Sequence, residues 1–487
     1  METGPLPGLL PLNPEIMSTT TKSIDLLEEL PPIPNKDYRP ELIRALASVV
    51  DCIIVLDDDP TGTQTVHHTP VLTEWTVPAI QAEFERGTDL FYILTNSRSL
   101  TETRAVQLAG EVGGNIKTAA GNTRTRFWVI SRSDSTLRGH YPAEVTALEE
   151  SLNLNAGIHF IIPAFFEGGR FTIDDIHYVQ QDQQLIPAAE TPYARDPVFG
   201  YKHSDLKLWV SEKTRGKVSS GQVGSIGIKE LRSGTIDQLI RKLARMVPGS
   251  HCVVNAAAYS DLVFFGLALI KSGVRPVFRT AASLVAALAC QPPKSLLTGD
   301  ELTLNNENGG LIVAGSFVST TTDQLNHLFQ HRPDLVQVEL SVSQLLESPA
   351  DHYAQGLTSR LDEVLRTGRS AVLFTSRKLI TDSSGEKNQL IGQKVSECLT
   401  DVVKALGTTP KFLISKGGIT SSDVATRSMG AKRAMVRGQV IMGVPVWQLG
   451  GESKFPGLHQ IIFPGNVGDQ QSLTQVVNML QPPVQNK

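Results

Sequence analysis

Short, uninterrupted apolar segments that alternate with helical stretches constrain the fold of this 487-residue chain more than any other feature. Helical stretches such as 100–112 and 143–153 separate these segments. The apolar segments in this part of the chain are residues 52–56, 90–95, 127–131, 158–163 and 251–255. Strands of a parallel sheet have this character, because helices cover both faces of such a sheet. The alternation therefore predicts an α/β fold with a mostly parallel sheet.

The same alternation begins again after a stretch rich in Pro, Asn and Gly at residues 291–310. Strand candidates then follow at 311–314, 336–340, 371–375 and 411–415, and the stretch 439–463 is strand-rich with several glycines. We expect two α/β domains with mostly parallel sheets, at residues 41–300 and 305–480. Residues 1–40 contain eight prolines and are expected to form a Pro-rich tail.

Composition excludes several classes of function. The chain has 45 Lys+Arg and 49 Asp+Glu, and a net charge of −4 gives no basic surface for nucleic acid or an anionic membrane. The longest apolar run, residues 262–270, is about half of the roughly 20 residues that a bilayer requires. The four cysteines form no CxxC pair, so neither a zinc site nor a disulfide framework is expected. No Lys or Arg precedes Lys22, which argues against a secretory signal and favours the cytoplasm.

An acidic turn follows the first predicted strand, with the sequence Asp57-Asp-Asp-Pro-Thr-Gly62. Adjacent carboxylates repel one another unless a cation or a ligand rich in donors shares them. In parallel sheets, ligands bind at the carboxyl ends of the strands, which is where this turn lies. We single out Asp58 and Asp59, although a solvated acidic turn is the alternative.

A second polar segment, Ser131-Arg-Ser-Asp-Ser-Thr-Leu-Arg-Gly-His140, follows the third strand. Guanidinium groups bind carboxylate or phosphate through a fork of donors, and hydroxyls recognise a polyol. The alternative is an N-cap for the helix near Pro142. The segment favours a site for a small, anionic, hydroxylated molecule. The residues expected to bind this molecule are Arg132, Asp134, Ser135, Arg138 and, further along the chain, Arg170.

Three glycine-containing turns follow predicted strands in the second domain, at residues 314–316, 415–420 and 463–469. Glycine lets backbone N–H groups approach a phosphate, especially where a helix begins. The shared position of the turns favours a nucleotide site. The sequence has neither a GxxxxGK[ST] nor a strand–GxGxxG–helix motif, so Walker-type and dinucleotide sites are not expected.

These motifs resemble a known family. Asp58-Asp-Pro-Thr-Gly62 and Asp134-Ser-Thr-Leu-Arg-Gly139 resemble the substrate-binding domain of the four-carbon acid sugar kinases. Ala314-Gly-Ser316, Gly417-Gly-Ile-Thr420 and Pro464-Gly-Asn466 resemble the nucleotide-binding domain of that family. The resemblance covers about residues 50–480 and implies ATP-dependent phosphorylation of a hydroxyl on threonate, erythronate or a 3-oxo-tetronate.

The resemblance also implies an active site in the cleft between the domains. Asp58 or Asp59 would orient the attacking hydroxyl and accept its proton. Arg138 and Arg132 would bind the acid sugar's carboxylate, and Ser135 a hydroxyl. ATP is implied with Mg²⁺, whose protein ligands stay unassigned. The residues expected near ATP are Ser316, Gly417, Gly418, Ile419, Thr420 and Gly465.

Two other classes of function stay open. A non-catalytic sensor could clamp a sugar acid between the domains without chemistry. An aldolase or isomerase could use the same acids and arginines on enolate chemistry without ATP. The expected partners are small molecules, with neither nucleic acid nor membrane, and a homo-oligomer is left open.

Overall fold

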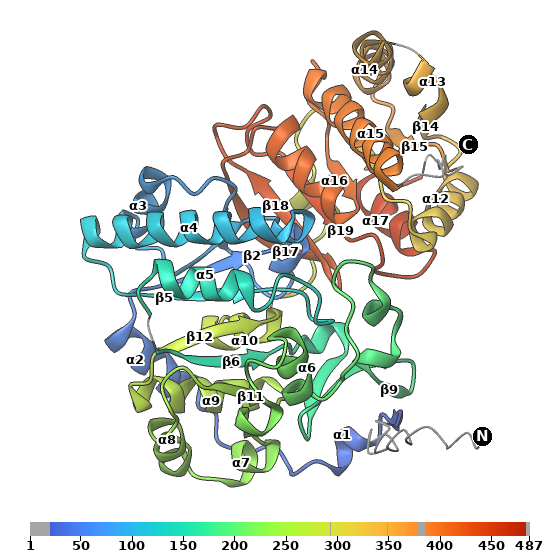
Figure 1. Cartoon of the computed structure of the whole chain (residues 1–487). Helices are drawn as coiled ribbons and strands as arrows, with labels where there is room; N and C mark the ends of the chain where they lie inside the picture. Colours follow the sequence, from blue (N-terminus) through green and yellow to red (C-terminus); the bar gives the residue numbers. More distant parts are fainter. Residues whose placement is uncertain (1–19, 155, 293, 348, 378–384, 484–487) are drawn as a thin grey trace, which may run out of the picture.

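The computed structural model describes residues 20–154, 156–292, 294–347, 349–377 and 385–483. Its main feature is one continuous sheet of 15 strands, which crosses the whole molecule (Figure 1). In spatial order the strands are β10 (Gly224–Ile226), β11 (His251–Val254), β6 (Ile158–Ile162), β12 (Pro276–Thr280), β5 (Phe127–Arg132), β2 (Cys52–Asp57), β4 (Leu90–Leu94), β3 (Thr69–Leu72), β17 (Arg433–Ile441), β18 (Val444–Leu449), β19 (His459–Phe463), β16 (Leu413–Lys416), β13 (Leu311–Ala314), β15 (Ala371–Thr375) and β14 (Val336–Leu340).

The two ends of the sheet are parallel and its middle is antiparallel. Neighbouring strands from β10 to β3 run parallel, and so do those from β19 to β14. The pairs β3–β17, β17–β18 and β18–β19 are antiparallel. The expected α/β fold is confirmed, but the two parallel sheets are joined into one, because β3 pairs with β17.

Helices cover both faces of the first parallel region. Cys52, Ile54 and Leu56 of β2 pack against one group of helices, and Ile53 and Val55 pack against the other. This alternation explains why the strand is apolar throughout. The helices are α3 (Val77–Glu85), α4 (Glu102–Thr123) and α5 (Ala143–Ser151) on one face, and α2 (Arg39–Val49), α8 (Ile236–Ala244), α9 (Tyr259–Ser272) and α10 (Ala282–Ala289) on the other.

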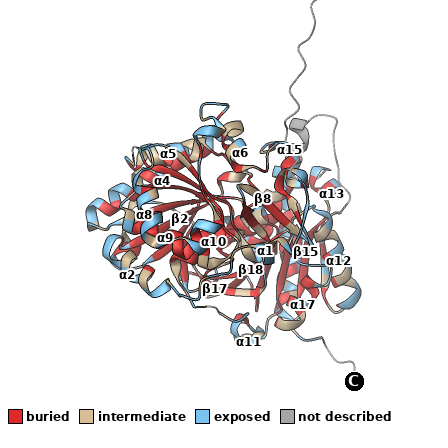
Figure 2. Ribbon diagram, turned by 90° about the horizontal axis from the view of Figure 1, so that it is seen from below, coloured by how far each residue is buried: buried red, intermediate tan, exposed pale blue. Residues whose placement is uncertain are grey.

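The second parallel region is built the same way. Ile312 and Ala314 of β13 pack against one helical layer, and Leu311 and Val313 pack against the other. Figure 2 shows the buried strands between helices whose outer sides are exposed. The first layer contains α11 (Gly299–Leu302), α12 (Ser319–His331) and α17 (Ser472–Leu480), and the second contains α13 (Val342–Glu347), α14 (Ala350–Arg366) and α15 (Gly385–Ala405).

A separate four-stranded antiparallel sheet lies beside the first region. Its strands in order are β1 (Lys22–Ser23), β9 (Gln184–Pro187), β8 (Ile176–Gln181) and β7 (Arg170–Ile173). The remaining helices are α1 (Leu26–Glu29), α6 (Leu206–Lys213), α7 (Ile228–Ser233) and α16 (Gly418–Asp423).

Part of the expected Pro-rich tail is packed against the rest of the protein, since β1 pairs with β9 and Leu26 contacts the small sheet's core. Residues 1–19 of that tail lie outside the described residues. Over the described ranges, no helix has both the length and the apolar character needed to cross a bilayer.

Candidate active site

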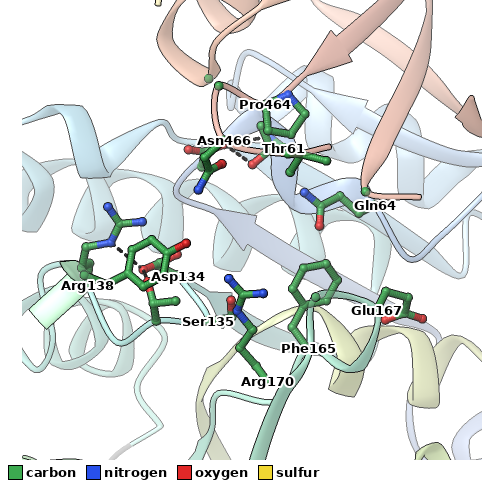
Figure 3. Close-up of a pocket in the computed structure, with 18 of the residues that line it drawn as sticks. Thr61, Gln64, Asp134, Ser135, Arg138, Phe165, Glu167, Arg170, Pro464 and Asn466 are labelled. Carbon is green, nitrogen blue, oxygen red and sulfur yellow. Dashed lines mark hydrogen bonds and ion pairs between the residues drawn. The ribbon is translucent and has the colours of Figure 1, made fainter. Parts of the chain in front are cut away.

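A cavity of about 420 Å³ lies between the carboxyl ends of the first strands and the turns of the second half, and we call it the substrate cavity. Figure 3 shows Pro464 and Asn466 across this cavity from Phe165 and Arg170. Of the expected site residues, those that line the cavity are Asp59, Arg132, Asp134, Ser135, Arg138, Arg170, Gly418 and Gly465. The sequence motifs that follow separate strands thus meet in one place.

The acidic turn has one fully buried carboxyl at its start. Asp57 ends β2, and Arg132 Nη1 donates to its Oδ1 over 3.0 Å. Burial raises the pKa of Asp57 to about 7, against the lowering effect of Arg132 and with a further rise from Asp58 and Asp59. Gly62 is needed here, because a Cβ at that position would lie 2.0 Å from Asp57 Oδ2. Asp57 therefore has a structural role: its buried side chain packs against the turn.

Asp59 is the aspartate of the turn that lines the substrate cavity, together with Thr61. Its Oδ1 accepts hydrogen bonds from the Thr61 amide at 2.8 Å and the Thr61 hydroxyl at 2.5 Å. Burial raises the pKa of Asp59, but the charges of Arg98 and Arg132 and the Thr61 hydrogen bonds outweigh it and hold the pKa below its ordinary value. Asp59 is consequently ionised at neutral pH.

Asp58 lies beneath the cavity wall and is 3% exposed. Arg98 Nη2 donates to its Oδ1 over 2.9 Å, and the Ser133 hydroxyl donates to its Oδ2 over 2.8 Å. Both of its oxygens are thus engaged within the fold. Asp58 thus links the turn to the segments that carry Arg98 and Ser133. It does not line the substrate cavity, whereas Asp59 does.

Arg98 is a central residue that was not among the expected site residues. Its guanidinium lies 2.9 Å from Asp58, 3.2 Å from Asp59 and 3.4 Å from Asp134, so one cation joins both polar segments. The sequence contains a signal for it, because Arg98 follows β4 just as the other polar segments follow β2 and β5. Asn96, with a φ of 49°, turns the chain toward the site at that strand end.

The segment after β5 is held rigidly by buried side chains. Asp134 accepts from Arg138 Nε over 2.8 Å. Arg279, which is 1% exposed, donates to the backbone carbonyls of Asp134 and Arg138 from below. His177 Nε2 lies 2.7 Å from the Ser135 carbonyl, and burial lowers the His177 pKa to about 3, so this imidazole is neutral and donates. Ser135 is thereby fixed at the cavity edge.

Arg170 differs from the other arginines of the cavity. Arg98, Arg132 and Arg138 each form an ion pair with at least one aspartate. Among the described residues, Arg170 has no ion-pair partner, and its buried Nε has no hydrogen-bond acceptor. Arg170 as a whole is half-buried, and its guanidinium lies 5.9 Å from the centre of the Tyr193 ring. Because this cation has no carboxylate partner, it could bind an anion through its fork of donors.

The glycine turns of the second half meet at Ser316. A Cβ at Gly417 would lie 3.0 Å from Ser316 Cβ, and one at Gly465 would lie 2.9 Å from Ser316 Oγ. Gly417 also has a φ of 113°, which favours glycine. A second cavity of about 400 Å³, the nucleotide-turn cavity, opens beside them. The expected residues that line it are Ser316, Gly417, Gly418, Ile419 and Thr420.

Lys416 is a second residue that the sequence analysis did not select. It is 0% exposed at the end of β16, and its Nζ donates to the carbonyls of Pro464 at 2.5 Å and Gly465 at 3.3 Å. Burial lowers the pKa of Lys416 to about 7. This side chain ties two of the glycine turns together.

The two halves of the site touch at Asp59 and Gly418. Gly418 lines both cavities, and a Cβ there would lie 3.1 Å from Asp59 Oδ2. The acidic turn is thus in direct contact with the start of α16. Among the described residues, no three His, Cys, Asp or Glu side chains are grouped to hold a metal ion by themselves.

Two family models match the chain. A sugar-binding N-terminal domain matches residues 53–288, and a nucleotide-binding C-terminal domain matches residues 311–473. The chain belongs to the two-domain four-carbon acid sugar kinase family. In this acid sugar kinase family member, the sugar-binding match supplies the acidic and arginine-rich walls of the substrate cavity, and the nucleotide-binding match supplies the glycine turns.

Solved structures have the same fold as this acid sugar kinase family member. A Salmonella typhimurium LT2 protein, provisionally described as a tRNA synthase, has a TM-score of 0.63 at 17% identity, covering 87% of this chain and 98% of its own. A Haemophilus influenzae protein of the DUF1537 family has a TM-score of 0.60 at 16% identity, covering 88% and 100%. No curated protein matches the chain.

Proposed function

We propose that the protein is an ATP-dependent kinase that phosphorylates a hydroxyl of a four-carbon acid sugar, such as threonate, erythronate or a 3-oxo-tetronate. Membership of the acid sugar kinase family supports this proposal. The observation that carries it is the contact between Asp59 and Gly418. A hydroxyl held by Asp59 in the substrate cavity would lie beside the turns that approach a nucleotide's phosphates.

The acid sugar's carboxylate binds Arg170 in this proposal. This assignment differs from the sequence-based one, which gave the carboxylate to Arg138 and Arg132. Both of those guanidiniums are already paired with aspartates, whereas Arg170 has no such partner among the described residues. Ser135, at the cavity edge, is the candidate donor or acceptor for a substrate hydroxyl.

Asp59 acts as the residue that orients the attacking hydroxyl. Its low pKa makes it a weak base, but the loose transition state of phosphoryl transfer requires positioning more than early proton removal. Its Oδ2, which lies 3.2 Å from Arg98 Nη2, would also accept the hydroxyl's hydrogen bond and take the proton late in the step. Asp58, with both oxygens engaged by Arg98 and Ser133, supports the turn.

ATP is the proposed phosphoryl donor, with its phosphates near Ser316, Gly417 and Gly465. The turns at β13 and β16 precede α12 and α16, and exposed N–H groups at such positions attract anions. Mg²⁺ bound with nucleotide phosphates needs only one or two protein carboxylates, so the absence of a three-ligand group among the described residues is compatible with it. When bound, the ion would neutralise charge on the transferred group.

The test is ADP release from ATP and Mg²⁺ with threonate, erythronate and their 2-oxo and 3-oxo derivatives. Asp59→Asn should lower kcat by about 10²–10⁴-fold and leave ATP binding unchanged. Asp51→Asn is the matched control, since Asp51 is an exposed residue paired with Arg126 at the other end of the strand.

Two results would contradict the proposal. Thermal stabilisation by these acids without ADP release would indicate a sensor, and turnover without ATP would indicate an aldolase or isomerase. The cytoplasmic location stays a prediction, and a homo-oligomer stays open.

A further inference from the structure

A third cavity, of about 370 Å³, lies next to the substrate cavity, and we call it the apolar cavity. Distant parts of the chain form it, mainly residues 64–67, helices α9 and α10 with the segment that follows, and the β17–β18 hairpin, with Arg39 of α2 and Glu167. Its apolar lining includes Val66, Val263, Ala286 and Ala287. This volume lies in the range of small-molecule sites, which are mostly apolar with a few polar groups.

Gln64 is the first polar group that points to a ligand. It is 6% exposed, and among the described residues its buried Oε1 has no hydrogen-bond donor. A buried amide oxygen left without a partner costs about 1–3 kcal/mol. Gln64 lines both the apolar and the substrate cavities, and Figure 3 shows its amide on the side of the substrate cavity.

Lys294 is the second such group. Its Nζ donates to the Arg437 carbonyl over 2.7 Å, which uses one of its three hydrogens. No carboxylate of the described residues lies within 4.0 Å of this ammonium. A full positive charge at the mouth of an apolar cavity favours an anion whose remaining body is apolar.

We propose that the apolar cavity is a second small-molecule site, for a carboxylate with an apolar body. The carboxylate binds Lys294, the body packs against Val263 and Ala286, and a hydroxyl or N–H at the ligand's other end donates to Gln64 Oε1. A four-carbon acid sugar carries polar groups along its whole length, so it matches the substrate cavity and not this one. The inference thus goes beyond the proposed function.

Occupancy of this site can reach the candidate active site through three shared residues. Gln64, Glu167 and Met442 line both cavities. Gln64 directly follows the 3₁₀ turn Pro60–Thr63, whose N-cap is Asp59. A ligand in the apolar cavity therefore contacts the same turn that presents Asp59.

Octanoate is the probe, octanamide is its neutral match, and Cys290 is the reporter. Cys290 lines the apolar cavity and is half-buried, whereas the other three cysteines are buried. Octanoate should slow alkylation of Cys290 by N-ethylmaleimide at least about tenfold at saturation, as read by peptide mass spectrometry on the full chain. Octanamide should bind about tenfold more weakly by calorimetry, because it lacks the charge.

Two variants locate the binding. Ala286→Phe, which fills the cavity, should weaken octanoate binding at least about tenfold. Lys294→Met should make octanoate and octanamide bind equally, and Lys229→Met on the exposed side of α7 should change neither. Octanoate binding that survives both Ala286→Phe and Lys294→Met would overturn the proposal. Loss of binding in Arg170→Met alone would overturn it too, because the probe would then occupy the substrate cavity. Neither readout requires kinase activity, so failure of the proposed function would be seen separately.

Discussion

Replacing Arg98 by methionine tests whether one buried cation organises the site. The side chain is 17% exposed and lies 2.9–3.4 Å from Asp58, Asp59 and Asp134. Methionine keeps most of the apolar stem but leaves these carboxylates close together without their shared partner. Removing one partner of a buried ion pair costs about 3–5 kcal/mol. At about 2–4 °C per kcal/mol, the melting temperature should fall by roughly 6–20 °C.

The pH dependence of this loss identifies its cause. Burial raises the pKa values of Asp59 and Asp134, and the charge of Arg98 is the largest contribution that outweighs it and holds both below the ordinary value. Stability from a lowered carboxyl pKa is present at neutral pH and is lost as the pH falls through the folded-state pKa. The difference between wild type and Arg98→Met should therefore be largest above about pH 5 and should narrow in acid.

The assay is thermal unfolding at pH 7.5 and at pH 3, below the ordinary carboxyl pKa, with Arg104→Met as the matched control. Arg104 lies on the exposed face of α4, and its side chain donates to Gln107. The control should change the unfolding free energy by less than about 0.5 kcal/mol. The reasoning is refuted if both variants lose the same stability, or if the Arg98→Met loss is the same at both pH values.

Three further changes test other parts of the site and the interface. Arg170→Met should raise the KM for the acid sugar by about 10–100-fold in steady-state kinetics with ATP affinity unchanged, and Arg170→Lys should recover part of it; an unchanged KM would contradict the carboxylate assignment. Burial lowers the pKa of Lys416 to about 7, so this lysine binds its proton more tightly in the unfolded chain than in the folded one. The free energy of unfolding of the wild type, measured with urea, should therefore rise between pH 7 and pH 9 by about 2 kcal/mol more than that of Lys416→Met. A constant difference would argue that the lysine stays charged when folded. Arg433→Met removes the 2.8 Å hydrogen bond from β17 to the buried Glu83 carboxylate and should lower the free energy of unfolding by about 1.5–3 kcal/mol. Lys432→Met removes an ion pair with Glu74 near the surface and should lower it by less than about 1 kcal/mol in the same assay.

Local sequence patterns predicted several of the strands with their exact bounds. The strands 311–314, 336–340 and 371–375 begin and end where the sequence predicts them. β3 and β12 were not predicted, because each contains a proline, Pro70 and Pro276, and β12 also contains an arginine. Such strands are recognisable only from the neighbours with which they pair.

The position of the site residues was predictable, but their partners were not. Polar residues after β2 and β5 do line one cavity, since the carboxyl ends of neighbouring parallel strands lie at the same edge. The choice among four arginines required distances. Arg132 and Arg138 each form an ion pair with an aspartate. Arg170 forms no such pair with any of the described residues.

The sequence by itself determined the α/β class, the acidic and arginine-rich strand ends and the glycine turns, because these depend on local periodicity and on which residue types follow a strand. Only the tertiary structure decided that β3 and β17 join both halves into one sheet, that Arg98 is shared by three aspartates, and that Asp59 meets Gly418. These contacts join residues from 36 positions apart, for Arg98 and Asp134, to 367 positions apart, for Thr69 and Val436. Pairing at such separations is set by packing of the whole chain, which a local pattern does not record.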